Sequence, residues 1–172
     1  MHRLFELRQA LPDDSEFLFD TYKLTLREHV EWAWGWDEDF QRNGFWTHHP
    51  IRDFQMVLVE GQRAGGLHVE LLPEQHFVRM IFLHPDFQRQ GMGSLLLRQT
   101  YEHARDAGKP LYLKVIQSNP ARRLYERLGF HLIDEDATTL TMCMRPQSPL
   151  LEHLAQVKSF GPITWSREDL YD

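Results

Sequence analysis

The sequence predicts one α/β domain built on a mixed sheet, and three observations support that class. The chain has 172 residues, close to one domain at roughly 150 residues per domain. Hydrophobic residues make up 42% of it and charged residues 26%, enough for a buried core and a polar surface. Apolar segments typical of strands are interleaved with segments of helical period, as in α/β proteins.

Strands and helices are expected to alternate through the first half of the chain. Pro12 to Ser15 is typical of a helix start, Gly35 interrupts the helical period, and Gly61 marks a turn. A nearly continuous apolar run predicts a strand that is covered on both faces. In chain order we expect a strand over 2–8, a helix from Pro12 to Val30, a short helix from Asp37 to Trp46, a hairpin of strands over 55–60 and 64–72, and the covered strand over 77–83.

The second half continues in the same way. Asn119 and Pro120 are typical of the N-cap and first position of a helix, and Gly108 and Gly129 of positions just past helix ends. We expect a helix over 91–107, a strand over 111–116, a helix from Asn119 to Leu128, and strands over 130–134 and 139–145. The domain is therefore assigned to residues 1–145. The tail, 146–172, is expected to pack on its own domain, with a dimer contact as the alternative, so that the protein is a monomer or a homodimer.

Charge and composition exclude several classes of function. The formal net charge of −6 gives no broad attraction to phosphate backbones, so we expect no nucleic-acid partner. A single cysteine, Cys143, excludes an internal disulfide and a cysteine-rich zinc site, and no metal is expected. No apolar run reaches the ~20 residues of a membrane span, and no signal peptide is visible. We therefore expect a cytoplasmic protein with no membrane partner.

The segment from Met80 to Ser94 carries the most specific signal. It reads as a buried strand, a short loop, glycines at 91 and 93, and then a helix. Such glycines let the backbone approach a ligand closely and leave the N–H groups of the helix N-terminus pointing outward, an arrangement that binds phosphates. The P-loop and dinucleotide fingerprints do not fit, because Leu95 follows Ser94 and Leu96 stands where a third glycine is required.

A second segment lies about thirty residues downstream and completes a known pattern. Gln88-x-x-Gly91-x-Gly93 after a strand, followed by a helix with Asn119, Tyr125 and Gly129-Phe130, resembles the GNAT acyltransferase superfamily. The resemblance is strong over 78–130 and holds in element order from about 2 to 145. It implies a mixed, mostly antiparallel sheet with a central parallel strand pair splayed for coenzyme A, flanked by about four helices.

The resemblance also implies an acetyl-CoA co-substrate and an amine acceptor. The pyrophosphate would lie on the backbone of the glycine loop, and the pantetheine arm between the strands that end near Leu83 and Val115, paired like an added strand. The oxyanion of the tetrahedral intermediate would meet a strand amide near Leu83. The residues expected to bind the cofactor are Phe82, Leu83, Gln88, Arg89, Gln90, Gly91, Met92, Gly93, Ser94, Asn119 and Arg122.

Tyr125 is the expected general acid, because attack on a thioester releases a thiolate that a neighbouring tyrosine can protonate or hydrogen-bond. The general base departs from the family's common pattern, since the strand over 77–83 holds no carboxylate. Glu70 is our candidate base, and its alternatives lie in the first helix, at Glu28, His29 and Glu31. We expect His84 to be structural.

The acceptor pocket is expected near a cluster of tryptophans that follows the first helix. Tryptophans with nearby carboxylates suit a cationic substrate, although large aromatics also close small cores. The candidate pocket residues are Glu28, His29, Glu31, Trp34 and Trp36. The predicted function is transfer of an acetyl group to a primary amine of a small molecule, an amino acid or a protein. The alternative is a non-catalytic sensor of acyl-CoA.

Overall fold

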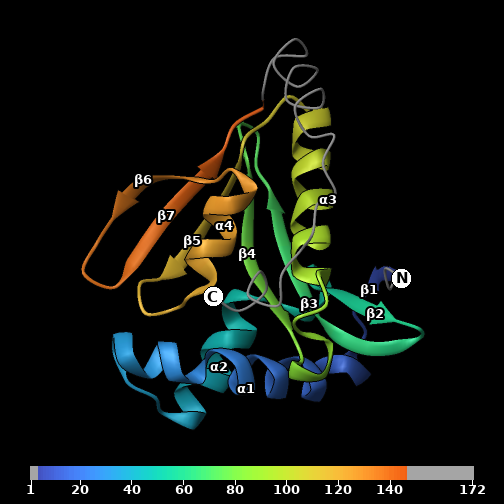
Figure 1. Ribbon diagram of the computed structural model, residues 1–172. Helices are drawn as coiled ribbons and strands as arrows, with labels where there is room; N and C mark the ends of the chain where they lie inside the picture. Colours follow the sequence, from blue (N-terminus) through green and yellow to red (C-terminus); the bar gives the residue numbers. More distant parts are fainter. Residues whose placement is uncertain (1–3, 147–172) are drawn as a thin grey trace.

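The computed structural model describes residues 4–146, which form a seven-stranded sheet with helices on both faces (Figure 1). The expected tail, which begins at 146, lies outside the described residues from 147 onward. The helices are α1 Ser15–Trp34, α2 Glu38–His48, α3 Met92–Asp106 and α4 Ala121–Leu128. The strands are β1 Phe5–Gln9, β2 Gln55–Val59, β3 Gln62–Leu71, β4 His76–Leu83, β5 Leu111–Ile116, β6 His131–Glu135 and β7 Thr139–Met144.

The sheet confirms the predicted fold class. Its strand order is β1-β2-β3-β4-β5-β7-β6, and among these neighbours β4 and β5 are the parallel pair. Each element matches an expected segment, with α1 reaching four residues further than expected, to Trp34. Gly35 ends this helix with a positive φ of 79°, a conformation that glycine adopts at little cost. None of the helices within 4–146 is long and apolar enough to cross a membrane.

Each face of the sheet carries its own hydrophobic cluster. The α3–α4 face is filled by buried side chains such as Leu96, Leu113 and Met142. The α1–α2 face is filled by Phe19, Phe54 and others. Because burial of apolar surface stabilises the folded state, the clusters on both faces hold the central strands in place.

A close contact seats α1 on the sheet beside β4. A Cβ added at Gly66 would lie 2.7 Å from Leu18 Cδ2 and 2.9 Å from Phe82 Cζ. Since real Cβ contacts do not reach such distances, a larger residue at this position would require the Leu18 and Phe82 side chains to shift. Glycine at this position therefore lets both side chains pack over β3 beside the site described below.

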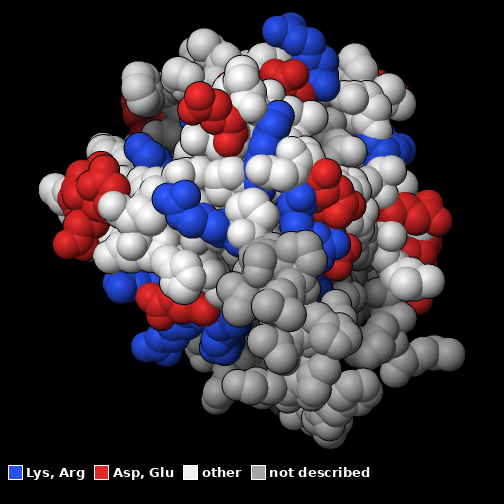
Figure 2. Space-filling view, turned by 90° about the horizontal axis from the view of Figure 1, so that it is seen from above, with Lys and Arg blue, Asp and Glu red and all other residues white. Residues whose placement is uncertain are grey.

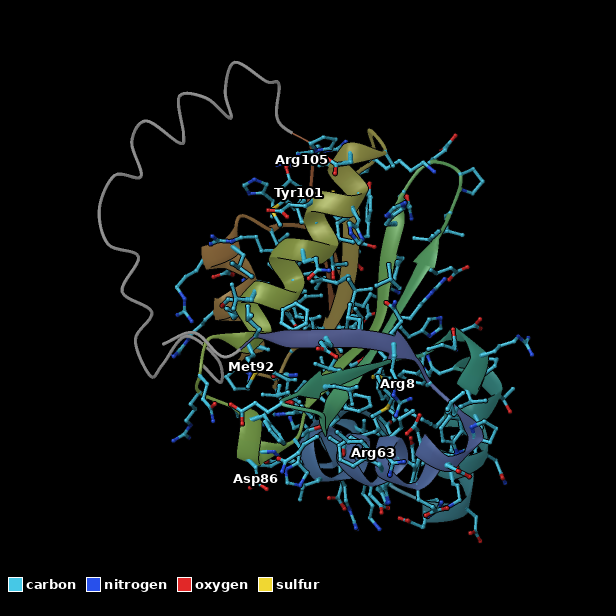
Figure 3. The ribbon with its side chains drawn as sticks, turned by 90° about the vertical axis from the view of Figure 1, so that its right-hand side faces the viewer. Arg8, Arg63, Asp86, Met92, Tyr101 and Arg105 are labelled. Atoms are coloured by element: carbon cyan, nitrogen blue, oxygen red, sulfur yellow. The ribbon has the colours of Figure 1, made fainter. Side chains whose placement is uncertain are left out.

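A buried carboxylate ties together β1, β3 and the start of α1. Asp14 is 1% exposed and accepts hydrogen bonds from Arg8 at 2.7 and 3.0 Å and from the Leu11 backbone N–H at 2.8 Å. Arg63 Nε lies 2.9 Å from the same side chain. Figure 3 shows Arg8 and Arg63 on the side of the molecule where α1 begins. The Arg8 hydrogen bonds hold the pKa of Asp14 below its ordinary value.

The Asp14→Asn substitution should lower the free energy of unfolding by about 2–3 kcal/mol at pH 7, since it leaves two arginines without their anion. Because the pKa of Asp14 is lowered by folding, its contribution is complete above the unfolded value of about 3.9 and disappears as the pH falls through the folded value. Urea unfolding at pH 7 and pH 3 measures both effects. The exposed neighbour Asp13→Asn is the control, expected within about 0.5 kcal/mol of wild type. Equal stability of the two variants at pH 7 would contradict this role.

Candidate active site

The central strands separate immediately after a short stretch of pairing. β4 and β5 pair over three residues each, from His76 to Val78 and from Leu111 to Leu113. On the other side of β4, the pairing with β3 jumps from Met80 to Val78, so that Arg79 is an extra, bulged residue. A bulge bends its strand. From this point β4 and β5 run apart toward α1 (Figure 1).

Three cavities lie at this opening. The first, the cleft, measures about 100 Å³ and is bordered by β4, α1, α3 and α4. The second, the central cavity, measures about 260 Å³ and lies between α1 and the separating strands. Leu26, Ile81, Asn119 and Tyr125 line both, so the cleft and the central cavity meet there. The third, the polar cavity, measures about 690 Å³ and shares Val78, Arg79 and Lys114 with the central cavity.

The glycine loop leads into α3 with its amides unused by the helix. Gly91 has a φ of 81°, and the first helical bond runs from the Leu95 N–H to the Gly91 carbonyl at 3.2 Å. The N–H groups of Met92, Gly93 and Ser94 precede this bond and have no helical acceptor. Ser94 Oγ is the one buried side-chain polar atom within residues 4–146 that lacks a hydrogen-bond partner. The start of α3 therefore offers several donors to an anion.

Gln88 fixes this loop to the end of β4. Its side-chain amide donates to the Leu83 carbonyl at 2.7 Å, and its backbone N–H donates to the Pro85 carbonyl at 3.2 Å. Gln88 therefore positions the loop, and its own N–H is already occupied. His84 belongs to the same turn, where its ring accepts a hydrogen bond from the Asp86 N–H at 3.2 Å. Figure 3 shows Asp86 in this loop, below Met92 at the base of α3.

The backbone of β4 beyond the bulge turns alternate groups to the opening. The His84 N–H donates to Ala64 of β3 at 2.7 Å, and Phe82 pairs with Gly66 of the same strand. Because successive residues of a strand direct their N–H and carbonyl groups to opposite edges, those of Ile81 and Leu83 point to the β5 side. Phe82 borders the cleft but pairs its backbone with β3. At this opening the backbone groups that face the β5 side belong to Ile81, which is not among the candidates expected from the sequence.

Tyr125 lies where the cleft and the central cavity meet. Its side chain is 8% exposed and packs edge-on against Phe130, with ring centroids 5.9 Å apart. Its hydroxyl has no hydrogen-bond partner within the described residues. Burial raises the pKa of Tyr125 to about 12. The phenol is therefore protonated at neutral pH and free to donate to a group in either cavity.

The helix that carries Tyr125 begins at Ala121, two residues after the expected start at Asn119. Asn119 Oδ1 accepts a hydrogen bond from the Ala121 N–H at 2.9 Å, which caps α4. His29 of α1 approaches the same loop, with Nδ1 2.9 Å from Ser118 Oγ. Arg122 lies on the exposed face of α4 and donates from Nε to Glu126 at 2.7 Å, so Glu126 holds one edge of its guanidinium.

The expected base lies in the polar cavity. Glu70 of β3 accepts a hydrogen bond from Arg79 Nε, and both side chains are close to 40% exposed. Two histidines border the same cavity, with His49 Nδ1 2.9 Å from His68 Nδ1. Burial is the main cause that lowers the pKa of both, to about 4 for His49. The histidine pair is therefore neutral at pH 7, with one ring donating to the other.

The structure separates the candidate acceptor residues that the sequence grouped together. Trp34 borders the central cavity and His29 borders the cleft. Glu28 and Glu31 line a different hollow on the outer side of α1, which they share with Lys23 and Arg27. Trp36 packs against Tyr22 in the α1–α2 cluster and donates to Glu38 at 2.9 Å. Of the five candidates, Trp34 and His29 thus lie at the opening between the strands.

The face of the molecule at the top of Figure 1 carries charges of both signs. Figure 2 shows lysine and arginine side chains interspersed with aspartate and glutamate over the face seen from above, with no continuous basic area. Over the described residues, no group of three or more His, Cys, Asp and Glu side chains is arranged to hold a metal ion.

The family model described as the acetyltransferase (GNAT) family matches residues 16–130. The chain belongs to this family. Among curated family members, it is 28% identical over 116 residues to the ribosomal protein bS18-alanine N-acetyltransferase of Haemophilus influenzae, covering 66% of this chain and 74% of that protein. It is 30% identical over 93 residues to the mycothiol acetyltransferase of Thermobifida fusca, covering 53% of this chain and 25% of that protein. The chain thus spans about a quarter of the latter relative's length.

Solved structures share the fold at low sequence identity. The PaiA N-acetyltransferase of Thermoplasma acidophilum in complex with coenzyme A aligns with a TM-score of 0.63 at 17% identity, covering 83% of this chain and 99% of that chain. N-acetylglutamate synthase of Neisseria gonorrhoeae, with coenzyme A and L-arginine, aligns with a TM-score of 0.60 at 16% identity, covering 86% of this chain and 34% of that chain. These structures support the GNAT architecture of the sheet.

Gly91→Trp should weaken acetyl-CoA binding at least tenfold, because Gly91 directly precedes α3 and a Cβ there meets nothing within 4 Å, so the indole can occupy space that the phosphates need. Gly108→Trp is a matched control at the other end of α3, with a φ of 69° and equally open surroundings. Both variants carry the same left-handed strain, so their melting temperatures should fall alike. Calorimetric titration with acetyl-CoA compares them. Tight binding by the Gly91 variant would contradict a phosphate site at this loop.

Proposed function

We propose that the protein transfers an acetyl group from acetyl-CoA to a primary amine. The observation that carries the proposal is the pair of cavities that meet at Tyr125, with unused amide donors at one end and a polar cavity at the other. A thioester reaching this junction from the α3 side would face an amine arriving from the polar cavity.

The start of α3 suits the pyrophosphate. The N–H groups of Met92, Gly93 and Ser94 lie at the positive end of the helix dipole and can donate to phosphate oxygens. The buried Ser94 hydroxyl would gain a hydrogen-bond partner if a phosphate oxygen bound there. Arg89 and Gln90, in the loop before the helix, are the side chains proposed to border the same phosphates. Arg122 is proposed to contribute through its terminal nitrogens, because only its Nε is bonded to Glu126.

The pantetheine arm is proposed to extend β4. Ile81 directs its N–H and carbonyl to the side where β5 has separated, so an amide-bearing arm can pair with Ile81 as a strand would. At Leu83 the carbonyl is held by the Gln88 side chain, and the N–H remains. The Leu83 N–H is then available to the carbonyl oxygen of the thioester, where it would stabilise the oxyanion. Asn119 borders both cavities, and its side-chain amide nitrogen remains available while Oδ1 caps the helix.

The reaction would proceed by direct attack of the neutral amine on the thioester carbonyl. Glu70 is proposed to accept the ammonium proton through water in the polar cavity, which is large enough to hold several water molecules. The tetrahedral intermediate then collapses as the C–S bond breaks, and the extra proton on the attacking nitrogen passes to water, which leaves a neutral amide and a thiolate. Tyr125 donates a hydrogen bond to the leaving sulfur. Since the pKa of Tyr125 is about 12 and that of a thiol about 8.5, this bond stabilises the thiolate without complete proton transfer.

Tyr125→Phe should lower kcat about 10²-fold and leave the affinity for acetyl-CoA unchanged, because the missing hydroxyl acts on the leaving sulfur. Release of free thiol from acetyl-CoA over a panel of amines measures the rate. Tyr101→Phe is the matched control, since Tyr101 lies toward the far end of α3 from Met92 (Figure 3). An unchanged rate in the Tyr125 variant would remove this role. Binding of acetyl-CoA without turnover of any amine would favour the acyl-CoA sensor instead.

A further inference from the structure

Two cations stand side by side where the central strands separate. Val78 pairs with Leu113 in the last parallel rung, so Arg79 and Lys114 are the next residues on each strand. Both side chains border the polar cavity and also the central cavity that reaches Tyr125. Like charges on neighbouring strands destabilise a sheet. Glu70 forms an ion pair with Arg79, and no described residue forms one with Lys114.

The terminal nitrogens of the Arg79 guanidinium are available to a ligand. Its Nε donates to Glu70, and the guanidinium carbon lies 4.4 Å from the centre of the Phe77 ring. Within residues 4–146, the two terminal nitrogens of Arg79 have no hydrogen-bond partner. The ion pair and the ring hold the plane of the guanidinium in place. A fixed fork of two N–H donors matches the two oxygens of a carboxylate.

Lys114 supplies the second positive charge. It is exposed, and within the described part of the chain its ammonium has no ion pair or hydrogen bond. Its neighbours along β5, Leu113 and Val115, are buried on the opposite face, which directs Lys114 toward α1. Arg79 of β4 and Lys114 of β5 therefore both border the polar cavity.

The other charged side chains that line the polar cavity indicate which net charge a ligand there should carry. Glu70 and Asp53 provide two carboxylates, against the two cations. The His49–His68 pair is neutral near pH 7, and His48 is the remaining titratable group of the lining. A polyamine would meet the two cations, and a doubly charged phosphate would meet the two carboxylates. A molecule with one positive and one negative charge faces an opposite charge at each end.

We propose that the acceptor is a zwitterionic amine of the amino-acid class, with its carboxylate held by Arg79 and Lys114. This proposal rests on the acetyl-transfer function proposed above. With the carboxylate between these side chains, which border both cavities, the α-amino group would be within the polar cavity that Glu70 also lines. The same anchor leaves the amino-acid side chain in the polar cavity, whose volume of about 690 Å³ is within the range of small-molecule sites.

The test compares amines that differ only in the carboxylate. Free thiol release from acetyl-CoA is measured with the common α-amino acids, with their carboxamides, with spermidine, and with peptides amidated at the C-terminus. We expect at least one amino acid to show a KM at least tenfold below that of its carboxamide. Comparable or faster turnover of the carboxamides, spermidine or amidated peptides would overturn the proposal while leaving acetyl transfer intact. No thiol release with any amine would overturn the proposed function itself.

Two variants locate the preference. Lys114→Gln and Arg79→Gln should each raise the KM for the amino acid about tenfold and leave the affinity for acetyl-CoA unchanged. The KM for the amino acid should then approach the KM for its carboxamide. Arg79→Lys keeps the charge but loses the fork and should give an intermediate KM. Arg105→Gln is the control, at the far end of α3 (Figure 3). An unchanged carboxylate preference in both Gln variants would contradict the proposal.

Discussion

The separation of β4 from β5 is the constraint on which the rest of the site depends. A sheet normally satisfies the backbone groups of its central strands, and here three paired residues on each strand are followed by divergence. The bulge at Arg79 bends β4 directly after the last rung, and Gly66 lets Leu18 of α1 pack close beside the bend. The result is a strand edge in the middle of the sheet that a ligand, and not another strand, can complete.

The proposed chemistry follows from what surrounds that edge. Donors at the start of α3 lie on one side, a buried and protonated Tyr125 at the junction, and a charged cavity on the other side. Gln88 connects these parts, because its side chain bonds to the Leu83 carbonyl while its backbone closes the turn toward α3. A net charge of −6 is compatible with anion binding because the donors are local backbone groups and a few aimed side chains.

Much of this architecture could be predicted from the sequence, because glycines and apolar periods report local structure. Gly35, Gly108 and Gly129 each follow a helix with a positive φ. The side of α1 on which each residue lies was harder to predict. The packing of α1 on the sheet places Glu28 and Glu31 on its outer side and Trp34 at the central cavity. Arg79 and Lys114 are each the one charged residue of an apolar strand, which the sequence shows but which does not reveal where the side chains lie. The bulge that changes the direction of Arg79 depends on the pairing of β4 with β3, which the sequence does not reveal.

Amide hydrogen exchange tests the central claim most directly, with and without saturating acetyl-CoA. If the separated strand edge and the start of α3 hold the thioester, the N–H groups of Ile81, Leu83, Met92, Gly93 and Ser94 should exchange more slowly in the complex. The amides of β1 and β2, which are already paired with each other, should change little. Protection confined to other parts of the chain, with Ile81 and Leu83 unaffected, would contradict the account.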